Sequence, residues 1–141
     1  MGVFRMQKQD KGVAYFLIFQ AVVGGLVFAH LAVNTSIPLG VWVVFAPLIA
    51  AALAAGIGSL ARKRWAAILG AVVFAAQVPI FASHYFSYSA WLGIHLDFAF
   101  TWDDQAKIGV NVFALVMLIW SGFRLNAPDS PFKEATPSES A

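Results

Sequence analysis

The sequence predicts an all-α membrane protein, a bundle of four transmembrane helices that run up-down-up-down. Of its 141 residues, 60% are hydrophobic and 11% are charged, whereas about 25% are charged in a typical soluble domain. The mean hydropathy is +0.76, and the apolar residues fall into four long segments. A small water-soluble fold cannot bury this many apolar side chains. The composition therefore excludes a soluble enzyme and a nucleic-acid binder.

The four apolar segments predict helices at about residues 13–34, 39–61, 65–86 and 107–124, within one transmembrane domain over residues 1–125. A bilayer core of about 30 Å takes about 20 helical residues, and backbone in lipid must satisfy its own hydrogen bonds. The first segment is interpreted as a retained helix, because no small-residue cleavage site of a signal peptide follows it. The fourth segment is shorter and is expected to stand upright in the bilayer.

Small and polar residues predict how the helices pack. The stretch Ala50–Gly58 in the second helix and Gly70 in the third allow close approach of neighbouring backbones. Pro47 and Pro79 are expected inside the second and third helices, where each would cause a kink. Three amides within the apolar segments are expected to hydrogen-bond between helices: Gln20, Gln77 and Asn111.

The distribution of Lys and Arg predicts that both termini are cytoplasmic. Eight of the nine cations fall in the N-terminal tail, the turn between the second and third segments, and the C-terminal tail. The opposite side holds only Lys107, together with Asp97, Asp103 and Asp104. By the positive-inside rule, the cation-rich side faces the cytoplasm. This places the chain as a multi-pass protein in the plasma or inner membrane.

The connection over residues 87–105 is a long outer loop with many aromatic residues. Leu96, Phe98 and Phe100 alternate with polar or small residues, which predicts an extended segment with one apolar face. Its candidate interface residues are Trp91, Phe98, Phe100 and Trp102. They suit either an anchor at the membrane surface or an element that docks a partner. The polar, proline-containing segment 126–141 is expected to be a disordered cytosolic tail.

Two histidines are the candidate cofactor ligands. His30 and His84 come at similar depth near the outer ends of the first and third helices, and Gln77 precedes His84 by two helical turns. Two imidazoles at matched depth are what a bis-histidine haem b needs. Both rings are then expected to face the bundle interior. The alternative is that each histidine simply lies at the interface, hydrogen-bonded to a carbonyl or a headgroup.

A second candidate site is a divalent metal centre on the outer side. Its proposed ligands are His84, His95 and Asp97, since a set of histidine and carboxylate suits Zn²⁺ or Cu²⁺.

No Asp, Glu, Lys or Arg lies within the core of an apolar segment. Transporters and pumps driven by ions generally use such a group, which argues against that class.

A faint internal repeat relates the first and third segments. Phe28-Ala29-His30 resembles Phe81-Ala82-Ser83-His84, each near the end of its segment. The second and fourth segments both open with Gly-Val followed by Val, Phe and Ala. A duplicated helical hairpin would produce this order.

Three functions are therefore considered. The first is a non-catalytic accessory or anchor subunit of a larger membrane complex, with the lipid bilayer and other membrane subunits, or itself, as partners. The second is a haem b electron-transfer protein, and the third is a small oligomeric transporter or channel. In helix number, size and paired histidines the chain resembles the small four-helix membrane anchors of respiratory complexes and b-type cytochromes, which implies a redox setting.

Overall fold

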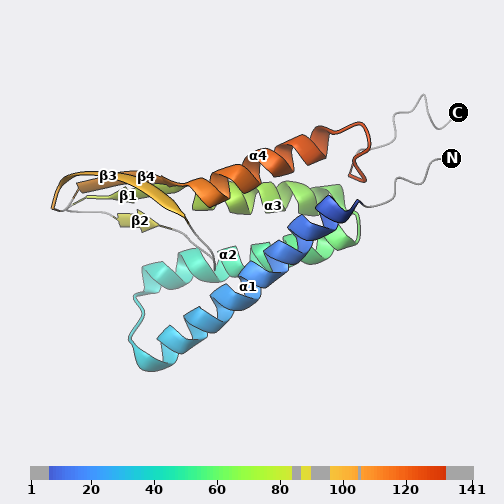
Figure 1. Cartoon of the computed structure of the whole chain (residues 1–141). Coiled ribbons are helices and arrows are strands. Elements are labelled where there is room, and N and C mark those ends of the chain that lie inside the picture. Colours follow the sequence, from blue (N-terminus) through green and yellow to red (C-terminus); the bar gives the residue numbers. More distant parts are fainter. Residues whose placement is uncertain (1–6, 84–86, 90–95, 105, 133–141) are drawn as a thin grey trace, which may run out of the picture.

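The computed structural model describes residues 7–83, 87–89, 96–104 and 106–132. Over these residues the chain forms four helices and a small antiparallel sheet (Figure 1). In order, the elements are α1 (Lys8–Asn34), α2 (Leu39–Leu60), α3 (Arg64–Gln77), β1 (Pro79–Ala82), β2 (Ser87–Ser89), β3 (Asp97–Asp103), β4 (Ala106–Asn111) and α4 (Val112–Asn126). The prediction of a mainly helical chain is confirmed, but the fold is not all-α.

Two of the four helices are long and apolar enough to cross a membrane. They are α1, with 27 residues, and α2, with 22. The helices α3 and α4 have 14 and 15 residues, or about 21–23 Å at a rise of 1.5 Å per residue. That is less than the bilayer core of about 30 Å. The third and fourth apolar segments, predicted as whole helices, each divide into a helix and a strand.

The boundary between α3 and β1 falls next to a proline. The helix ends at Gln77, and Pro79 is the first residue of β1 rather than a kink inside a helix. Proline is tolerated at the first position of a strand, where it removes no ladder hydrogen bond. The carbonyl of Val78 accepts a hydrogen bond from the N–H of Asn111, at 2.7 Å, which starts the pairing with β4. Pro47, by contrast, lies inside α2 as predicted.

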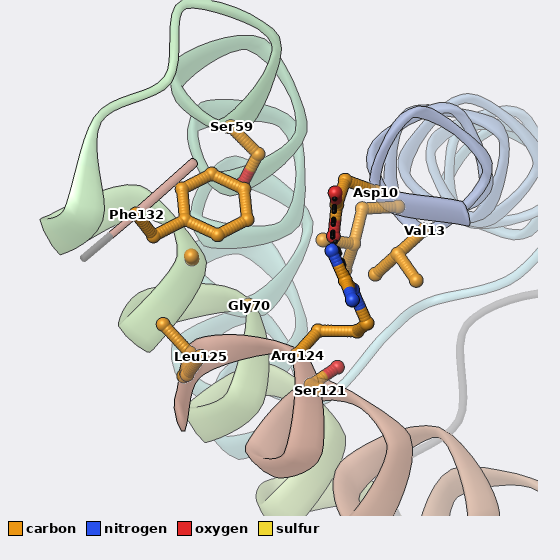
Figure 2. Close-up of a pocket in the computed structure, with 10 residues that line it drawn as sticks. Asp10, Val13, Ser59, Gly70, Ser121, Arg124, Leu125 and Phe132 are labelled. Carbon is orange, nitrogen blue, oxygen red and sulfur yellow. Dashed lines mark hydrogen bonds and ion pairs between the residues drawn. The ribbon is translucent and has the colours of Figure 1, made fainter. Parts of the chain in front are cut away.

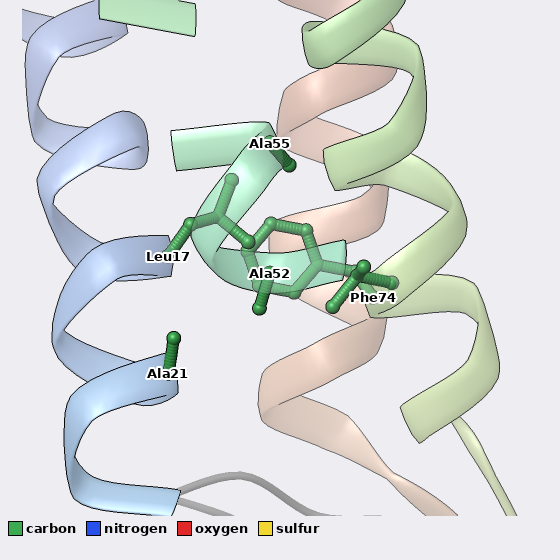
Figure 3. Close-up of a cluster of buried hydrophobic side chains, with 6 residues drawn as sticks. Leu17, Ala21, Ala52, Ala55 and Phe74 are labelled. Carbon is green, nitrogen blue, oxygen red and sulfur yellow. The ribbon is translucent and has the colours of Figure 1, made fainter. Parts of the chain in front are cut away.

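The helices converge at the end of the molecule where α1 begins and α4 ends (Figure 1). From there α1 packs on α2, α2 on α3, and α3 on α4. The main core lies where α1, α2 and α3 meet (Figure 3). Its fully buried members are Leu17, Ala21, Ala52, Ala55, Val73 and Phe74. The first hairpin, α1 and α2, diverges from α3 and α4 toward the opposite end.

Glycines make two of these helix contacts possible. A Cβ atom on Gly56 would lie 2.5 Å from the Ile18 side chain and 2.9 Å from the Ala14 carbonyl oxygen, so α1 and α2 touch through backbone there. A Cβ atom on Gly58 would collide with the Cβ of Ala66 in α3. The predicted small-residue packing of the second helix is therefore confirmed.

The sheet continues from the end of α3 and leads into the start of α4, away from the end where the helices converge (Figure 1). Its strand order is β2-β1-β4-β3, and every pair is antiparallel. The segment predicted as a loop over residues 87–105 thus contains two strands. The extended conformation expected from its alternating pattern is confirmed by β3, which has seven residues.

The segment after α4 packs back on the helices. Phe132 is buried against Ala14, Leu60 and Ala67. Ser130 is fully buried as well. The described part of the predicted disordered tail is therefore ordered, because its one large apolar side chain fills a gap at the converging helix ends. The rest of that tail lies outside the described residues.

Candidate functional site

The sheet has one apolar face and one face of mostly small or polar residues. Residues that pair directly across an antiparallel sheet place their side chains on the same face. Two rows of paired residues form what we call the apolar sheet face: Tyr88, Phe81, Ile108 and Phe100, then Pro79, Val110 and Phe98. The intervening rows carry mainly small or polar residues, with Ile80 as their one large apolar member, and Ile80 is buried: Ser87, Ala82, Lys107 and Thr101, then Ser89, Ile80, Gly109 and Ala99. The sheet is therefore amphipathic.

The apolar sheet face is most exposed along β3. Phe98, Phe100 and Trp102 are 73%, 66% and 57% exposed. The rings of Phe100 and Trp102 have centroids 6.3 Å apart, so Trp102 extends the same face. Phe81 and Ile108 are exposed as well. A contiguous apolar surface of this kind marks a site of interaction with a protein or a membrane.

Tyr88, in the edge strand β2, attaches the sheet to the helices. Its hydroxyl donates a hydrogen bond of 2.8 Å to the carbonyl of Ala76, near the end of α3. Partial burial raises the pKa of the Tyr88 phenol above its ordinary value, because burial disfavours the phenolate. The apolar sheet face is thus held against the helices at β2 and open at β3.

Asn111 fixes the junction between β4 and α4. Its side-chain oxygen accepts from the N–H of Ala114, at 3.2 Å, as the N-cap of α4. The same oxygen accepts from the N–H of Leu96, at 3.4 Å, just before β3. The expected bond between helices is wrong for this residue, which instead caps a helix and positions β3. Gln77 donates to the carbonyl of Val73 in its own helix, at 3.3 Å.

A buried ion pair joins the first helix to the last (Figure 2). The Arg124 guanidinium donates to both carboxylate oxygens of Asp10, at 2.8 and 2.9 Å. Arg124 also donates to Asp129, at 3.3 Å, and Asp129 accepts from the Gln7 side chain. The Asp10 side chain is fully buried. Because α1 and α4 share few other contacts, this pair closes the bundle at its converging end.

The cavity beside this ion pair is too small to hold a substrate. Its volume is about 20 Å³, and Ser59, Ser121 and Phe132 help to line it (Figure 2). About 10–15 Å³ is enough for one water molecule. Among the described residues, no group hydrogen-bonds the buried Ser121 hydroxyl. The arrangement is a structural polar cluster with room for a single water.

The structure places only part of the predicted haem site. His30 is exposed near the end of α1, and its Nδ1 lies 3.3 Å from the side-chain nitrogen of Asn34. The inward orientation expected for this ring is not found. Gln77 is buried at the end of α3. His84 lies outside the described residues, so ligation of haem b by the two histidines stays a prediction.

The predicted metal site also lies mostly outside the described residues. Asp97 is the first residue of β3, whereas His84 and His95 are not described, and neither is Trp91 of the predicted interface. Within the described ranges, no group of three or more His, Cys, Asp or Glu side chains could hold a metal ion.

Comparisons with protein-family models, curated proteins and solved structures find no match to this chain.

Two features of the site were not predicted from sequence. The first is the contribution of Phe81 and Ile108 to the apolar sheet face, because both residues sit in runs that look like transmembrane helix. The second is the pairing of Asp10 with Arg124. A signal for it existed: Asp10 is the only acidic residue before Asp97, in a region with six Lys and Arg residues.

Proposed function

We propose that the chain is a multi-pass protein of the plasma or inner membrane, a non-catalytic accessory or anchor subunit of a larger membrane complex. In this proposal, α1 and α2 hold the chain in lipid and the apolar sheet face docks on a partner subunit. The observation that carries the proposal is the set of exposed apolar residues on three neighbouring strands: Phe81 in β1, Ile108 in β4, and Phe98 and Phe100 in β3.

The position of the charges supports an orientation with both termini in the cytoplasm. Lys8 and Lys11 at the start of α1, the three cations at 62–64, and Arg124 at the end of α4 lie toward the converging end of the helices. Asp97, Asp103 and Lys107 belong to the sheet. Cations gathered at one end favour that end as the cytoplasmic one.

The sheet edges favour a protein partner over lipid tails. Hydrocarbon offers no hydrogen bonds, so an open sheet edge does not occur within it. Immersing the apolar sheet face in lipid tails would bring the edge of β3 with it. A partner protein can cover the face and leave the edges in water or paired. Lipid contact is then left to the exposed apolar side chains of α1 and α2, such as Leu26, Val33 and Val43.

A photocrosslinking experiment tests this docking. A photoreactive phenylalanine analogue replaces Phe100 on the apolar sheet face, and in a matched control it replaces Thr101 on the opposite face of the same strand. We expect the analogue at position 100 to form an adduct with another membrane protein in whole membranes, alone or beside an adduct with a second copy of this chain. The yield at position 101 is expected to be at least fivefold lower.

Two further results decide the proposal. Phe98→Ser, in the neighbouring row, should abolish the adduct while the chain stays in the pellet after alkaline carbonate extraction. Crosslinks that reach only lipid, or only a second copy of this chain, would contradict an accessory role. Release of the wild-type chain by carbonate would contradict the membrane anchor itself.

A further inference from the structure

Among the described strands, β3 is a long edge of the sheet, and from Phe98 to Asp103 its side away from β4 faces no other described strand. The strand order leaves β2 and β3 at the two edges. β2 has three residues, which is short for an edge, whereas β3 has seven, and all but Ala99 are exposed. An exposed, apolar edge strand of this length is a ready template for pairing with another strand. In the described part of the chain, no strand lies beyond it.

Hydrogen bonds identify which residues of β3 turn their backbone outward. The carbonyl of Leu96 accepts from the N–H of Val112 in α4, at 2.7 Å. Backbone groups alternate in direction along an antiparallel pair. Even-numbered residues of β3 therefore bond toward β4, and Ala99 and Thr101 direct their N–H and C=O groups away from it.

The contact between Ala99 and Gly109 supports the same assignment. A Cβ atom on Gly109 would lie 2.6 Å from the Cβ of Ala99, its direct partner. Strands approach most closely at pairs that do not exchange hydrogen bonds. Ala99 is thus in such a pair with β4, and its backbone groups are directed to the open edge.

We propose that two copies of this chain pair through β3, antiparallel and about a two-fold axis at Ala99. The ladder with β4 is regular from Asp97 to Thr101 and irregular between Thr101 and Asp103. Ala99 is the midpoint of the regular part. Around it, Phe98 of one copy lies opposite Phe100 of the other, and Asp97 lies opposite Thr101. Aromatic pairs facing each other across strands are stabilising.

Charge disfavours the two-fold register whose axis lies one residue further along, at Phe100. An axis at Phe100 would place Asp97 of each copy opposite Asp103 of the other, and like charges opposite one another are destabilising. A basic segment of a different protein would also suit the acidic residues, but no self-complementary aromatic pairing would then be needed. The pattern Asp-Phe-Ala-Phe-Thr over 97–101 is complementary to itself, as a two-fold interface requires.

Pairing at β3 would close the assembly at two copies. Of the described strands, the joined sheet would hold four from each copy, and the short β2 strands would form its edges. The apolar sheet faces of both copies would become continuous through Phe98 and Phe100. This inference goes beyond the proposed function, because a partner subunit would contact the face and the second copy contacts the edge.

Single cysteines test the register, because the chain has no native Cys. In the proposed dimer the Cα atoms of the two Ala99 residues are about 5.5 Å apart, within the range that a disulfide spans. We expect Ala99→Cys to give a crosslinked dimer on mild oxidation in membranes. Thr101→Cys is the matched control. In the proposed dimer the two residues at position 101 are four positions apart along the paired strands, about 13 Å. Its yield of crosslinked dimer is expected to be at least tenfold lower.

Mixing variants and a proline substitution complete the test. Asp97→Cys co-expressed with Thr101→Cys should crosslink, whereas neither should do so alone. Ala99→Pro removes an outward N–H and leaves the ladder with β4 intact, so native mass spectrometry should show a shift from dimer to monomer. An unlinked Ala99→Cys, or equal linkage at Thr101→Cys, would overturn the pairing. Either result leaves the photocrosslinking test of the accessory role unaffected.

Discussion

Similar apolar segments adopt different structures in the two halves of the chain. The first half is a hairpin of two long helices, α1 and α2. In the second half, α3 and α4 stop early and the chain continues as paired strands. The segments matched in sequence show the contrast, because Phe28 is in a helix and Phe81 is in a strand. Hydrophobicity alone therefore does not decide between helix and strand here.

Loss of the ion pair between the two halves is expected to have the largest effect on stability. Arg124→Ala leaves the fully buried carboxylate of Asp10 without its cation, and losing one partner of a buried pair typically costs about 3–5 kcal/mol. We expect a loss of stability at the lower end of that range, since Arg124 is partly exposed. Unfolding in mixed detergent measures it. The paired variant Asp10→Asn with Arg124→Gln should recover much of the loss, and equal stability of all three proteins would contradict this role.

A second substitution acts on the first half alone. Gly56→Ala introduces a Cβ atom into the backbone contact with Ile18 and Ala14, and overpacking of this kind costs about 1–3 kcal/mol. Gly122→Ala in α4 is the matched control, because a Cβ atom there meets nothing within 4 Å. We expect the control to be neutral or slightly stabilising. If both variants unfold at the same detergent concentration, α1 and α2 are not in close contact at Gly56.

The junction of sheet and helix is tested in the second half. Asn111→Ala removes the N-cap of α4 and the bond to Leu96, and loss of a cap costs about 1 kcal/mol. Asn111→Asp keeps an accepting oxygen and should retain most of the stability. Hydrogen exchange provides the second measurement. Relative to wild type, we expect the alanine variant to gain more hydrogen exchange in β3 than in α1. An equal increase in both elements would contradict a local role.

The smallest effect is expected at the contact of β2 with α3. Tyr88→Phe removes one hydrogen bond to Ala76, worth about 1 kcal/mol. The raised pKa of Tyr88 means that the folded state favours the neutral phenol. Its contribution is complete below the ordinary pKa of about 10 and is lost as pH rises through the higher folded value. Melting curves at pH 8 and pH 11 should therefore converge for wild type and variant, and a constant difference would contradict this account.

Local pattern was sufficient for several elements. The apolar runs predicted α2 and all of α1 except its polar first turn, because α1 begins at Lys8 rather than near residue 13. The strand β3 follows from alternation at Phe98 and Phe100. Small residues such as Gly56 correctly indicated close packing. The same alternation in β3 made its aromatic residues candidates for an interface, and they are exposed. These features depend on neighbours in sequence, which is why the sequence alone could predict them.

Other features depend on partners far away in the chain. The apolar composition was enough to predict a mainly helical chain. The positions of Lys and Arg along the sequence were enough to predict that most of them gather at one end of the helices. The end of α3 at Gln77, however, is followed at once by a long-range contact, because the carbonyl of Val78 pairs with Asn111 in β4. Contacts of the same kind place Phe81 on one face with Phe100 and bring Asp10 to Arg124. The physical reason is that strand pairing and buried ion pairs form between distant segments, so their energy is absent from any local pattern.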